Sequence, residues 1–183
     1  MSARLDTPRL RLRRLAAADC NARYLGWLQD PQVNRYLETR FVTQTLAGIR
    51  GYVERANART DEHLFGIVLK AGERHIGNLK LGPLRAPHSL ADVSLFIGER
   101  DCWGQGYATE AIVAASRHAF EALGVRKLNA GIYAPNAGST RAFIKAGYRE
   151  EARRPGHYLL DGKPCDILEL GCTLQDLSAA PAR

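Results

Sequence analysis

The stretch that decides the fold runs from Leu90 to Leu123 and reads LADVSLFIGERDCWGQGYATEAIVAASRHAFEAL. Its apolar, β-branched beginning over residues 93–97 predicts a strand. A turn over residues 98–101 and the glycine-rich run WGQGYA follow. Beyond that run, apolar residues recur every three or four positions, which predicts a helix with one buried face. The order is therefore strand, glycine-rich loop, helix.

The glycine-rich loop has the features of an anion site, and phosphate is the anion that suits it best. Small residues at Gly104, Gly106 and Ala108 let backbone N–H groups approach a ligand closely. The helix that follows adds unpaired N–H groups and the positive end of its dipole. The loop lacks the Gly-Lys-Ser/Thr ending of a P-loop, and Thr109 stands where a dinucleotide fingerprint has its third glycine. A tight turn that only caps a buried helix is the structural alternative.

The run WGQGYATEA after a strand resembles the pyrophosphate loop of the GNAT acetyltransferases, which bind acetyl-CoA. The family writes this loop Gln/Arg-x-x-Gly-x-Gly/Ala, and Gly106 and Ala108 match its last two fixed positions. Trp103 stands where the family has Gln or Arg, so that contact must be made differently or omitted. The resemblance implies that the cofactor contacts of the loop come from Trp103, Gly104, Gln105, Gly106, Tyr107, Ala108 and Thr109.

A second segment resembles the other GNAT signature, an Asn followed by Ser, an aromatic residue and Gly-aromatic at fixed spacing. It begins at Asn136, continues through Ser139 and Phe143, and ends at Gly147-Tyr148. The resemblance implies that Asn136, Ser139 and Phe143 lie along the pantetheine arm of the cofactor. An amide offers both a donor and an acceptor, which suits pantetheine, while a helix cap is the structural alternative for Asn136.

Position 143 departs from the family pattern. Many GNAT enzymes carry a Tyr there, which protonates the departing thiolate, whereas Phe143 has no proton to give. Tyr133 or water could donate the proton instead. A thiol with a pKa near 8.5 could also leave as thiolate without help.

The reaction implied by the resemblance is the attack of a neutral amine on a thioester. It needs a positioned cofactor, an oxyanion donor and a way to remove the proton of the ammonium form. In the family, the central strand splays from its neighbour and exposes backbone N–H groups to the acetyl carbonyl. Here Phe96, Ile97 and Gly98 would supply those groups.

The general base has several candidates. Asp92, at the start of the central strand, stands where GNAT enzymes often carry an acidic residue, and it shares a strand face with Ser94. Glu99 in the turn and Glu110 in the first turn of the helix are weaker candidates. His75 titrates in a suitable range. A structural role is the alternative for each of these residues, including Asp92.

The rest of the chain predicts an α/β (α+β) fold in a single GNAT-like domain over residues 1–183. We expect a mixed central sheet of about seven strands flanked by about four helices. The residues 175–183 are expected to form a frayed tail. Asp19 and Thr43 or Thr45 are candidate caps of the early helices. The predicted strands cover 9–15, 63–70, 75–81, 93–97, 127–133 and two more within 148–173, and the predicted helices cover 19–29, 45–58, the segment after the loop and 139–146.

Composition and charge favour some classes of binding partner over others. With 26 basic and 19 acidic residues the net charge is +7, which favours anionic partners such as a phosphorylated cofactor. The charge is spread along the chain, so we expect no direct nucleic-acid binding. No apolar run is long enough to span a bilayer and the N-terminus lacks an apolar signal core, so we expect no membrane partner and a cytoplasmic protein. The four cysteines form no CxxC pair, which favours free buried thiols over a metal site.

Residues 26–40 and 75–84 resemble the RimJ/RimL-type branch of the GNAT family, and within it acetyltransferases of amino sugars in surface-polysaccharide pathways. The resemblance implies acetyl-CoA as co-substrate and a nucleotide-linked amino sugar as acceptor. A protein N-terminal amine is the main rival, with polyamines and aminoglycosides behind it. A non-catalytic, CoA-binding regulatory module is the alternative from another class. A homodimer is left open.

Overall fold

A computed structural model of the chain describes residues 4–179. Its eight strands form one sheet in the order β1-β2-β3-β4-β5-β6-β8-β7, antiparallel except for β5 and β6. The strands are β1 Arg4–Asp6, β2 Leu10–Arg14, β3 His63–Leu69, β4 Arg74–Leu81, β5 Leu90–Ile97, β6 Lys127–Tyr133, β7 Arg149–Leu160 and β8 Lys163–Cys172. The helices are α1 Ala22–Gln29, α2 Pro31–Asn34, α3 Leu46–Ala58, α4 Tyr107–Ala122, α5 Ala137–Lys145 and α6 Leu174–Ala179.

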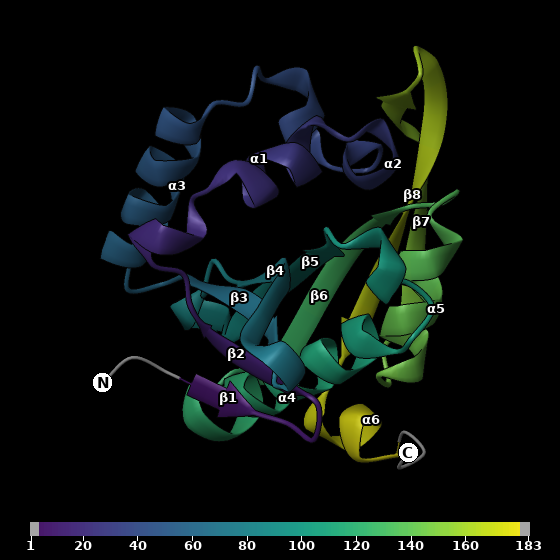
Figure 1. Ribbon diagram of the computed structural model, residues 1–183. Helices are drawn as coiled ribbons and strands as arrows, with labels where there is room; N and C mark the ends of the chain where they lie inside the picture. The colour runs from purple at the N-terminus through teal and green to yellow at the C-terminus, as the bar shows by residue number, and fades with distance from the viewer. Residues whose placement is uncertain (1–3, 180–183) are drawn as a thin grey trace.

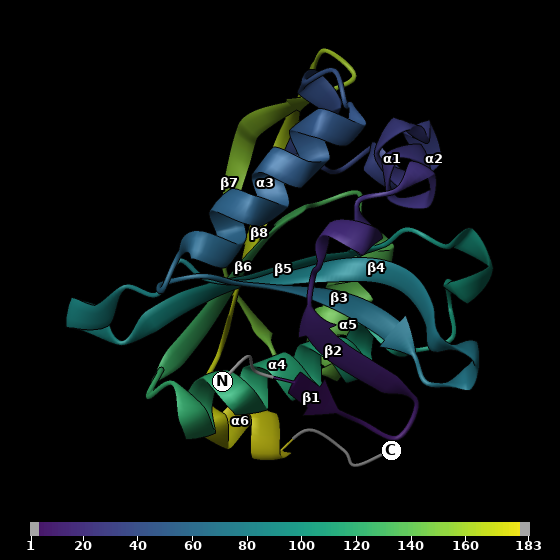
Figure 2. The same cartoon turned by 60° about the vertical axis from the view of Figure 1, so that its left-hand side comes forward.

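Helices cover the sheet from both sides. Helices α1, α2 and α3 lie on one side, and α4, α5 and α6 lie on the other (Figures 1 and 2). The larger core packs α4 and α5 on the sheet, whereas a second core packs α1 and α3 on its opposite face. The β7–β8 hairpin extends past the sheet on the α1–α3 side (Figure 2). Within residues 4–179 no helix is both long and apolar enough to cross a membrane.

The fold class is confirmed, with more elements than expected. The sheet has eight strands instead of about seven, and the described chain has six α-helices instead of about four. Strand β1 is only Arg4–Asp6, too short for an alternation pattern, and forms by pairing with β2. Pro31 both ends α1 and starts α2, because proline fits the first position of a helix and the Asp30 side chain caps it.

Two expectations about chain segments are wrong. Asn21, not Asp19, caps α1, because the Asn21 side chain accepts from the amides of Arg23 and Tyr24. Asp19 is instead buried and accepts two hydrogen bonds from Arg13, of 2.7 and 2.8 Å. The tail expected to fray from 175 is helical up to Ala179, since Leu177 is buried in the larger core. The positions 180–183 lie outside the described residues.

Strand β5 is paired very differently on its two sides. It pairs with β4 without interruption from Val93 to Ile97. With β6 it pairs only over Leu90–Asp92, opposite Lys127–Asn129, after which β6 continues beside β8. The two parallel strands therefore separate beyond Asp92, and this separation, expected from the resemblance, opens the sheet in its middle.

Candidate active site

The backbone of β5 presents two amides to the gap between β5 and β6. The Gly98 amide donates to Ile76 O over 2.8 Å, and at the other end of the pairing Gly82 N donates to Asp92 O over 2.8 Å. Hydrogen-bonded pairs alternate along an antiparallel ladder. The backbone N–H and C=O groups of the even-numbered residues of β5 therefore point toward β4. The amides of Leu95 and Ile97 therefore point toward the gap.

This geometry corrects part of the expected oxyanion site. Of the three residues predicted to donate to the acetyl carbonyl, Ile97 has an amide that faces the gap. The amides of Phe96 and Gly98 point toward β4 instead, because these residues have even numbers. The amide of Leu95, which the sequence analysis did not single out, also points toward the gap.

Two glycines permit the close packing at the end of β5. A Cβ at Gly77 would overlap the carbonyl oxygen of Phe96, and a Cβ at Gly98 would overlap the ring of Trp27. The Trp27 indole covers this turn and donates to the Glu99 carboxylate over 3.0 Å. Glu99, one of the candidate bases, is therefore tied to α1.

The glycine-rich loop forms a row of unpaired amides. Gly104 and Gly106 have φ of +74° and +82°, a conformation that favours glycine, and Gly106 is the N-cap of α4. The first backbone bond of the helix runs from Glu110 N to Gly106 O. Within residues 4–179, the amides from 104 to 109 have no hydrogen-bond partner in the chain. Together with the helix dipole, these amides can bind a pyrophosphate.

Trp103 has a structural contact at the position where the family carries Gln or Arg. Its indole Nε1 donates to Ile97 O over 2.8 Å, although the side chain is 43% exposed. This bond ties the beginning of the loop to the end of β5. Gln105 contributes a similar tie, since its side-chain amide donates to Asp101 O.

The second motif lies next to the first turn of α4. The hydroxyl of Thr109 donates to Ala142 O of α5 over 3.3 Å, which joins the two motifs. Asn136 is the N-cap of α5, as the structural alternative predicted, because its Oδ1 accepts from Ser139 N over 3.2 Å. Phe143 is 2% exposed and packs edge-on against Tyr148 in the larger core. Its side chain is therefore not placed to contact a cofactor, contrary to the expectation.

Asp92 is held in an ion pair. Arg85 donates to both of its carboxylate oxygens, over 2.7 and 3.1 Å, and Asn129 Nδ2 lies 3.4 Å from Oδ1. The positive charge of Arg85 favours the ionised form of this carboxylate, which makes Asp92 a weaker base. The predicted catalytic role of Asp92 stays a prediction.

The other candidate bases are bound more tightly into the fold. His75 is 9% exposed, its Nε2 lies 2.8 Å from Asn78 Oδ1, and burial lowers the pKa of its imidazole. Burial alone would raise the pKa of Glu110, but hydrogen bonds from Thr7 and Arg9 bring that pKa below its ordinary value. Neither side chain is free to receive a proton from a substrate.

A cavity of about 510 Å³ lies over the point where β5 and β6 separate. Asp92 and Ser94 line it and share a strand face with Phe96, which packs against the α1–α3 core, so the cavity opens on that side of the sheet. Its charged and polar lining includes Arg85, Asp92, Asn129, Glu151, Arg154 and Glu169. Arg154 Nε lies 3.0 Å from Glu169, and Lys127 lies 2.7 Å from Glu151.

A cluster that the sequence analysis found only in part lies at the far end of β6. The Tyr133 hydroxyl donates to Glu38 over 2.5 Å and accepts from Arg40 over 2.9 Å. Arg40 also donates to Leu159 O of the β7–β8 hairpin. Burial and the bond to Glu38 raise the pKa of Tyr133, which makes it a weaker acid. Sequence pattern gave no sign of Glu38 or Arg40, because each lies more than ninety positions from Tyr133.

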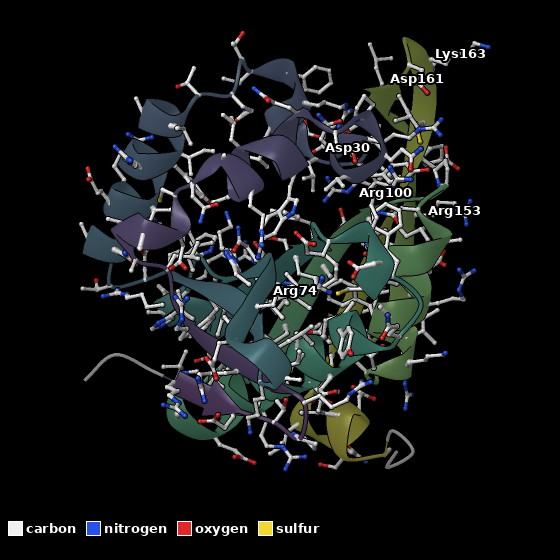
Figure 3. The ribbon with its side chains drawn as sticks, viewed as in Figure 1. Asp30, Arg74, Arg100, Arg153, Asp161 and Lys163 are labelled. Carbon is white, nitrogen blue, oxygen red and sulfur yellow. The ribbon has the colours of Figure 1, made fainter. Side chains whose placement is uncertain are left out.

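On the same side of the sheet, an exposed ion pair joins the segment after α2 to the β7–β8 hairpin. Figure 3 places Asp161 and Lys163 at the tip of the β7–β8 hairpin, with Arg153 nearer the sheet. Asp161 lies 2.9 Å from Arg35, the residue after α2. Segment 31–41 and the hairpin therefore meet above the gap.

The cysteines are separate thiols. All four cysteines are buried free thiols, as predicted. Among the residues that the structure describes, no three His, Cys, Asp or Glu side chains are grouped to hold a metal ion.

Comparisons with known proteins agree with this architecture. Residues 9–149 match the model of the acetyltransferase (GNAT) domain family. An uncharacterized N-acetyltransferase of Bacillus subtilis, YoaA, is 26% identical over 171 residues, covering 88% of this chain and 92% of that protein. A spermidine N-acetyltransferase from Vibrio cholerae, solved with CoA and spermine, has a TM-score of 0.83 at 17% identity, covering 94% and 99% of the two chains. RimJ from Mycobacterium smegmatis, solved with CoA-disulfide, has a TM-score of 0.82 at 19% identity, covering 98% and 90%.

The chain therefore belongs to the GNAT acetyltransferase family. It is an acetyl-CoA-dependent N-acetyltransferase, and the alternative of a non-catalytic module is not retained. The solved structures, below 25% identity, show the fold. The amino-sugar branch within the family stays a prediction.

Proposed function

We propose that the enzyme acetylates a primary amine that enters the gap from the α1–α3 side of the sheet. The observation that carries this proposal is the separation of β5 from β6 beyond Asp92, with the Ile97 amide facing the opening. The neutral amine attacks the thioester carbonyl, a C–N bond forms, the C–S bond breaks to release the CoA thiolate, and the nitrogen gives its extra proton to water. The Ile97 amide stabilises the oxyanion.

The cofactor would lie along one continuous path. Its pyrophosphate binds the unpaired amides from 104 to 109, and its pantetheine arm enters the gap beside Ile97. Asn136 borders this path from α5, where its Nδ2 remains available after Oδ1 has capped the helix. Because Phe143 has no hydroxyl, the departing thiolate takes its proton from water or leaves unprotonated.

We further propose that the acceptor carries an anionic group besides its amine, as a nucleotide-linked amino sugar does. The support is the mixed charge of the cavity, where Arg85 and Arg154 can exchange a carboxylate partner for an anion of the substrate. The carboxylates that these arginines release, Asp92 and Glu169, can then hold the ammonium group before it loses its proton. A polyamine carries only positive charge and has no group for these two arginines.

A panel of amines tests this proposal, with release of the CoA thiol as the readout. The panel holds a nucleotide-linked amino sugar, the same sugar without its nucleotide, spermidine and a short peptide with a free N-terminus. We expect the highest kcat/KM for the nucleotide-linked sugar, and a lower value when the nucleotide is removed. Preference for spermidine would refute the anionic acceptor, and preference for the peptide would favour the protein N-terminal amine.

A matched pair of variants tests the role of the cavity itself. Arg154→Gln removes a lining cation, whereas Arg153→Gln changes its exposed neighbour, which lies outside the cavity lining. Arg154→Gln should raise the KM of the best acceptor about tenfold, the usual cost of a lost charged hydrogen bond. Equal effects of the two substitutions would contradict binding in this cavity.

A further inference from the structure

Arg9 reaches the glycine-rich loop from a distant part of the sequence. It lies immediately before β2, and its Nη1 donates to Gln105 O inside the loop over 2.9 Å. Its guanidinium lies over the ring of Tyr107, 4.5 Å from the centroid. A Cβ at Gly106 would lie 3.5 Å from Arg9 Nη2, so this nitrogen is beside the N-cap of α4. The guanidinium is therefore next to the row of unpaired amides.

Arg9 also binds the acidic residue of the first helical turn. Its Nε donates to Glu110 Oε2 over 2.7 Å, and its backbone N–H donates to Oε1 over 2.9 Å. Thr7 completes the set with a bond of 2.6 Å from its hydroxyl to Oε1. A carboxylate one turn from a bound pyrophosphate would repel it, and the ion pair with Arg9 reduces that repulsion.

The guanidinium still has donors for a ligand. Nε is used by Glu110 and one hydrogen of Nη1 by Gln105, while within the described chain Nη2 has no hydrogen-bond partner. The side chain is 47% exposed, so these hydrogens are accessible from solvent. An arginine fixed on two sides, with donors left over, suits recognition of a phosphate.

We propose that Arg9 belongs to the phosphate site of this acetyltransferase, where it fixes the loop, neutralises Glu110 and presents its guanidinium to the pyrophosphate of acetyl-CoA. The inference rests on the proposal that the amides from 104 to 109 bind the pyrophosphate. It also explains how the site works with Trp103 in the place of Gln or Arg. The Trp103 indole is occupied by Ile97 O, and the cation beside the loop is Arg9, immediately before β2, instead.

The test compares acyl donors with and without phosphates. Kinetics are measured with acetyl-CoA, acetyl-dephospho-CoA and S-acetylpantetheine for the parent enzyme, Arg9→Met and Arg11→Met. Arg11 is the control, because it is an arginine two positions further along the chain, in β2, that pairs with Glu73, away from the loop. We expect Arg9→Met to raise the KM of both CoA donors at least about tenfold while the kcat/KM with S-acetylpantetheine changes less than about threefold. Arg11→Met should change neither.

The three donors also distinguish phosphate binding by the loop from the role of Arg9 in it. If the parent enzyme does not prefer acetyl-CoA to S-acetylpantetheine, the phosphate assignment of the loop fails. If the parent has that preference and Arg9→Met keeps it, only the role of Arg9 fails. If Arg9→Met lost the same kcat/KM with all three donors, Arg9 would only stabilise the fold and would not contact a phosphate. Loss with acetyl-CoA but not with its dephospho form would move the contact to the 3′-phosphate and overturn the pyrophosphate assignment.

Glu110→Gln keeps the test decisive if Arg9→Met does not fold. The glutamine can still accept from Thr7 and Arg9 but carries no charge, so the affinity for acetyl-CoA should stay equal or increase while the melting temperature falls. A tenfold loss of affinity in Glu110→Gln would contradict the proposed neutralisation. Arg9→Lys retains a cation without the fork that reaches both Glu110 and Gln105, and its KM for acetyl-CoA should lie between the parent and Arg9→Met.

Discussion

The cofactor half and the acceptor half of this active site are built from different parts of the chain. In the proposed function, the cofactor half uses backbone amides of one continuous segment, from Leu95 to Thr109, in which Gly104 and Gly106 have positive φ. The acceptor half uses side chains such as Arg85, Asn129 and Arg154, which come from separate strands and connections. Backbone recognition depends on conformation, and side-chain recognition depends on residue type. A substitution should therefore affect the two halves by different routes.

The largest effect is expected where conformation is decisive. Gly106→Val places a branched side chain at a φ of +82°, beside Arg9 and in the path of the pyrophosphate. We expect kcat/KM for acetyl-CoA to fall by about a hundredfold or more. The control is Gly72→Val, since Gly72 has a φ of +76° with nothing near its Cβ position and lies in the β3–β4 connection.

Both valine variants should lose a similar amount of stability, about 1–2 kcal/mol from the left-handed backbone. Only Gly106→Val should lose binding of acetyl-CoA, measured by the shift in melting temperature that the ligand produces. If Gly72→Val weakened acetyl-CoA binding as much, backbone conformation in the loop would not be the basis of cofactor recognition.

Asp92→Asn tests the acceptor half. The ion pair with Arg85 leads us to expect a binding role, with the KM of the acceptor raised about tenfold and kcat changed less than about threefold. A general base would give the opposite pattern: a loss of about a hundredfold in kcat, partly recovered as the pH rises and the amine becomes neutral. A pH–rate profile of the parent and the variant with one acceptor distinguishes the two roles.

What could be predicted from the sequence follows the same division. The strand, loop and helix around Gly106 were predicted correctly, because local periodicity and glycine positions determine them. The separation of β5 from β6 and the use of Ile97 came only from resemblance. Which amides of β5 face the gap could not be derived, since it depends on the hydrogen bonds from Gly82 N to Asp92 O and from Gly98 N to Ile76 O.

The side-chain part of the site was predicted less well. Asp92 was identified as an acidic residue, but its partner Arg85 was not, because the pairing depends on the loop between β4 and β5. Phe143 was assigned to the cofactor on resemblance alone, whereas the turn of α5 directs it into the core against Tyr148. Contacts such as that of Arg9 with Gln105 join segments 96 positions apart and leave no local pattern in the sequence.

A buried and a partly buried histidine should make stability depend on pH. Burial lowers the pKa of His118 on α4 and of His75 on β4. The unfolded chain therefore binds more protons than the folded one below the ordinary histidine pKa, so stability falls as the pH drops through about 6.5. We expect a melting temperature several degrees lower at about pH 5.5 than at about pH 7.5.

A variant of His118 measures the contribution of this residue to the pH dependence. His118 Nε2 is buried without a hydrogen-bond partner in the described chain, so His118→Leu should stabilise the protein more at the lower pH than at the higher one. Exposed His157 on the β7–β8 hairpin is the control, and His157→Leu should leave the pH dependence unchanged. An unaltered pH dependence in His118→Leu would exclude His118 as a cause.

The smallest effect is expected at Tyr133, although its hydroxyl lies at the end of the strand that borders the gap. Its pKa is raised by burial and by the bond to Glu38, and its proton is directed at that carboxylate rather than toward the gap. The CoA thiol, with an ordinary pKa near 8.5, can leave without an acid. Tyr133→Phe should therefore change kcat by less than about threefold between pH 6.5 and pH 9, while the loss of the bonds to Glu38 and Arg40 costs about 1 kcal/mol of stability. A fall in kcat of more than about tenfold, with normal KM values for acetyl-CoA, would instead identify Tyr133 as the proton donor in place of the missing hydroxyl at Phe143.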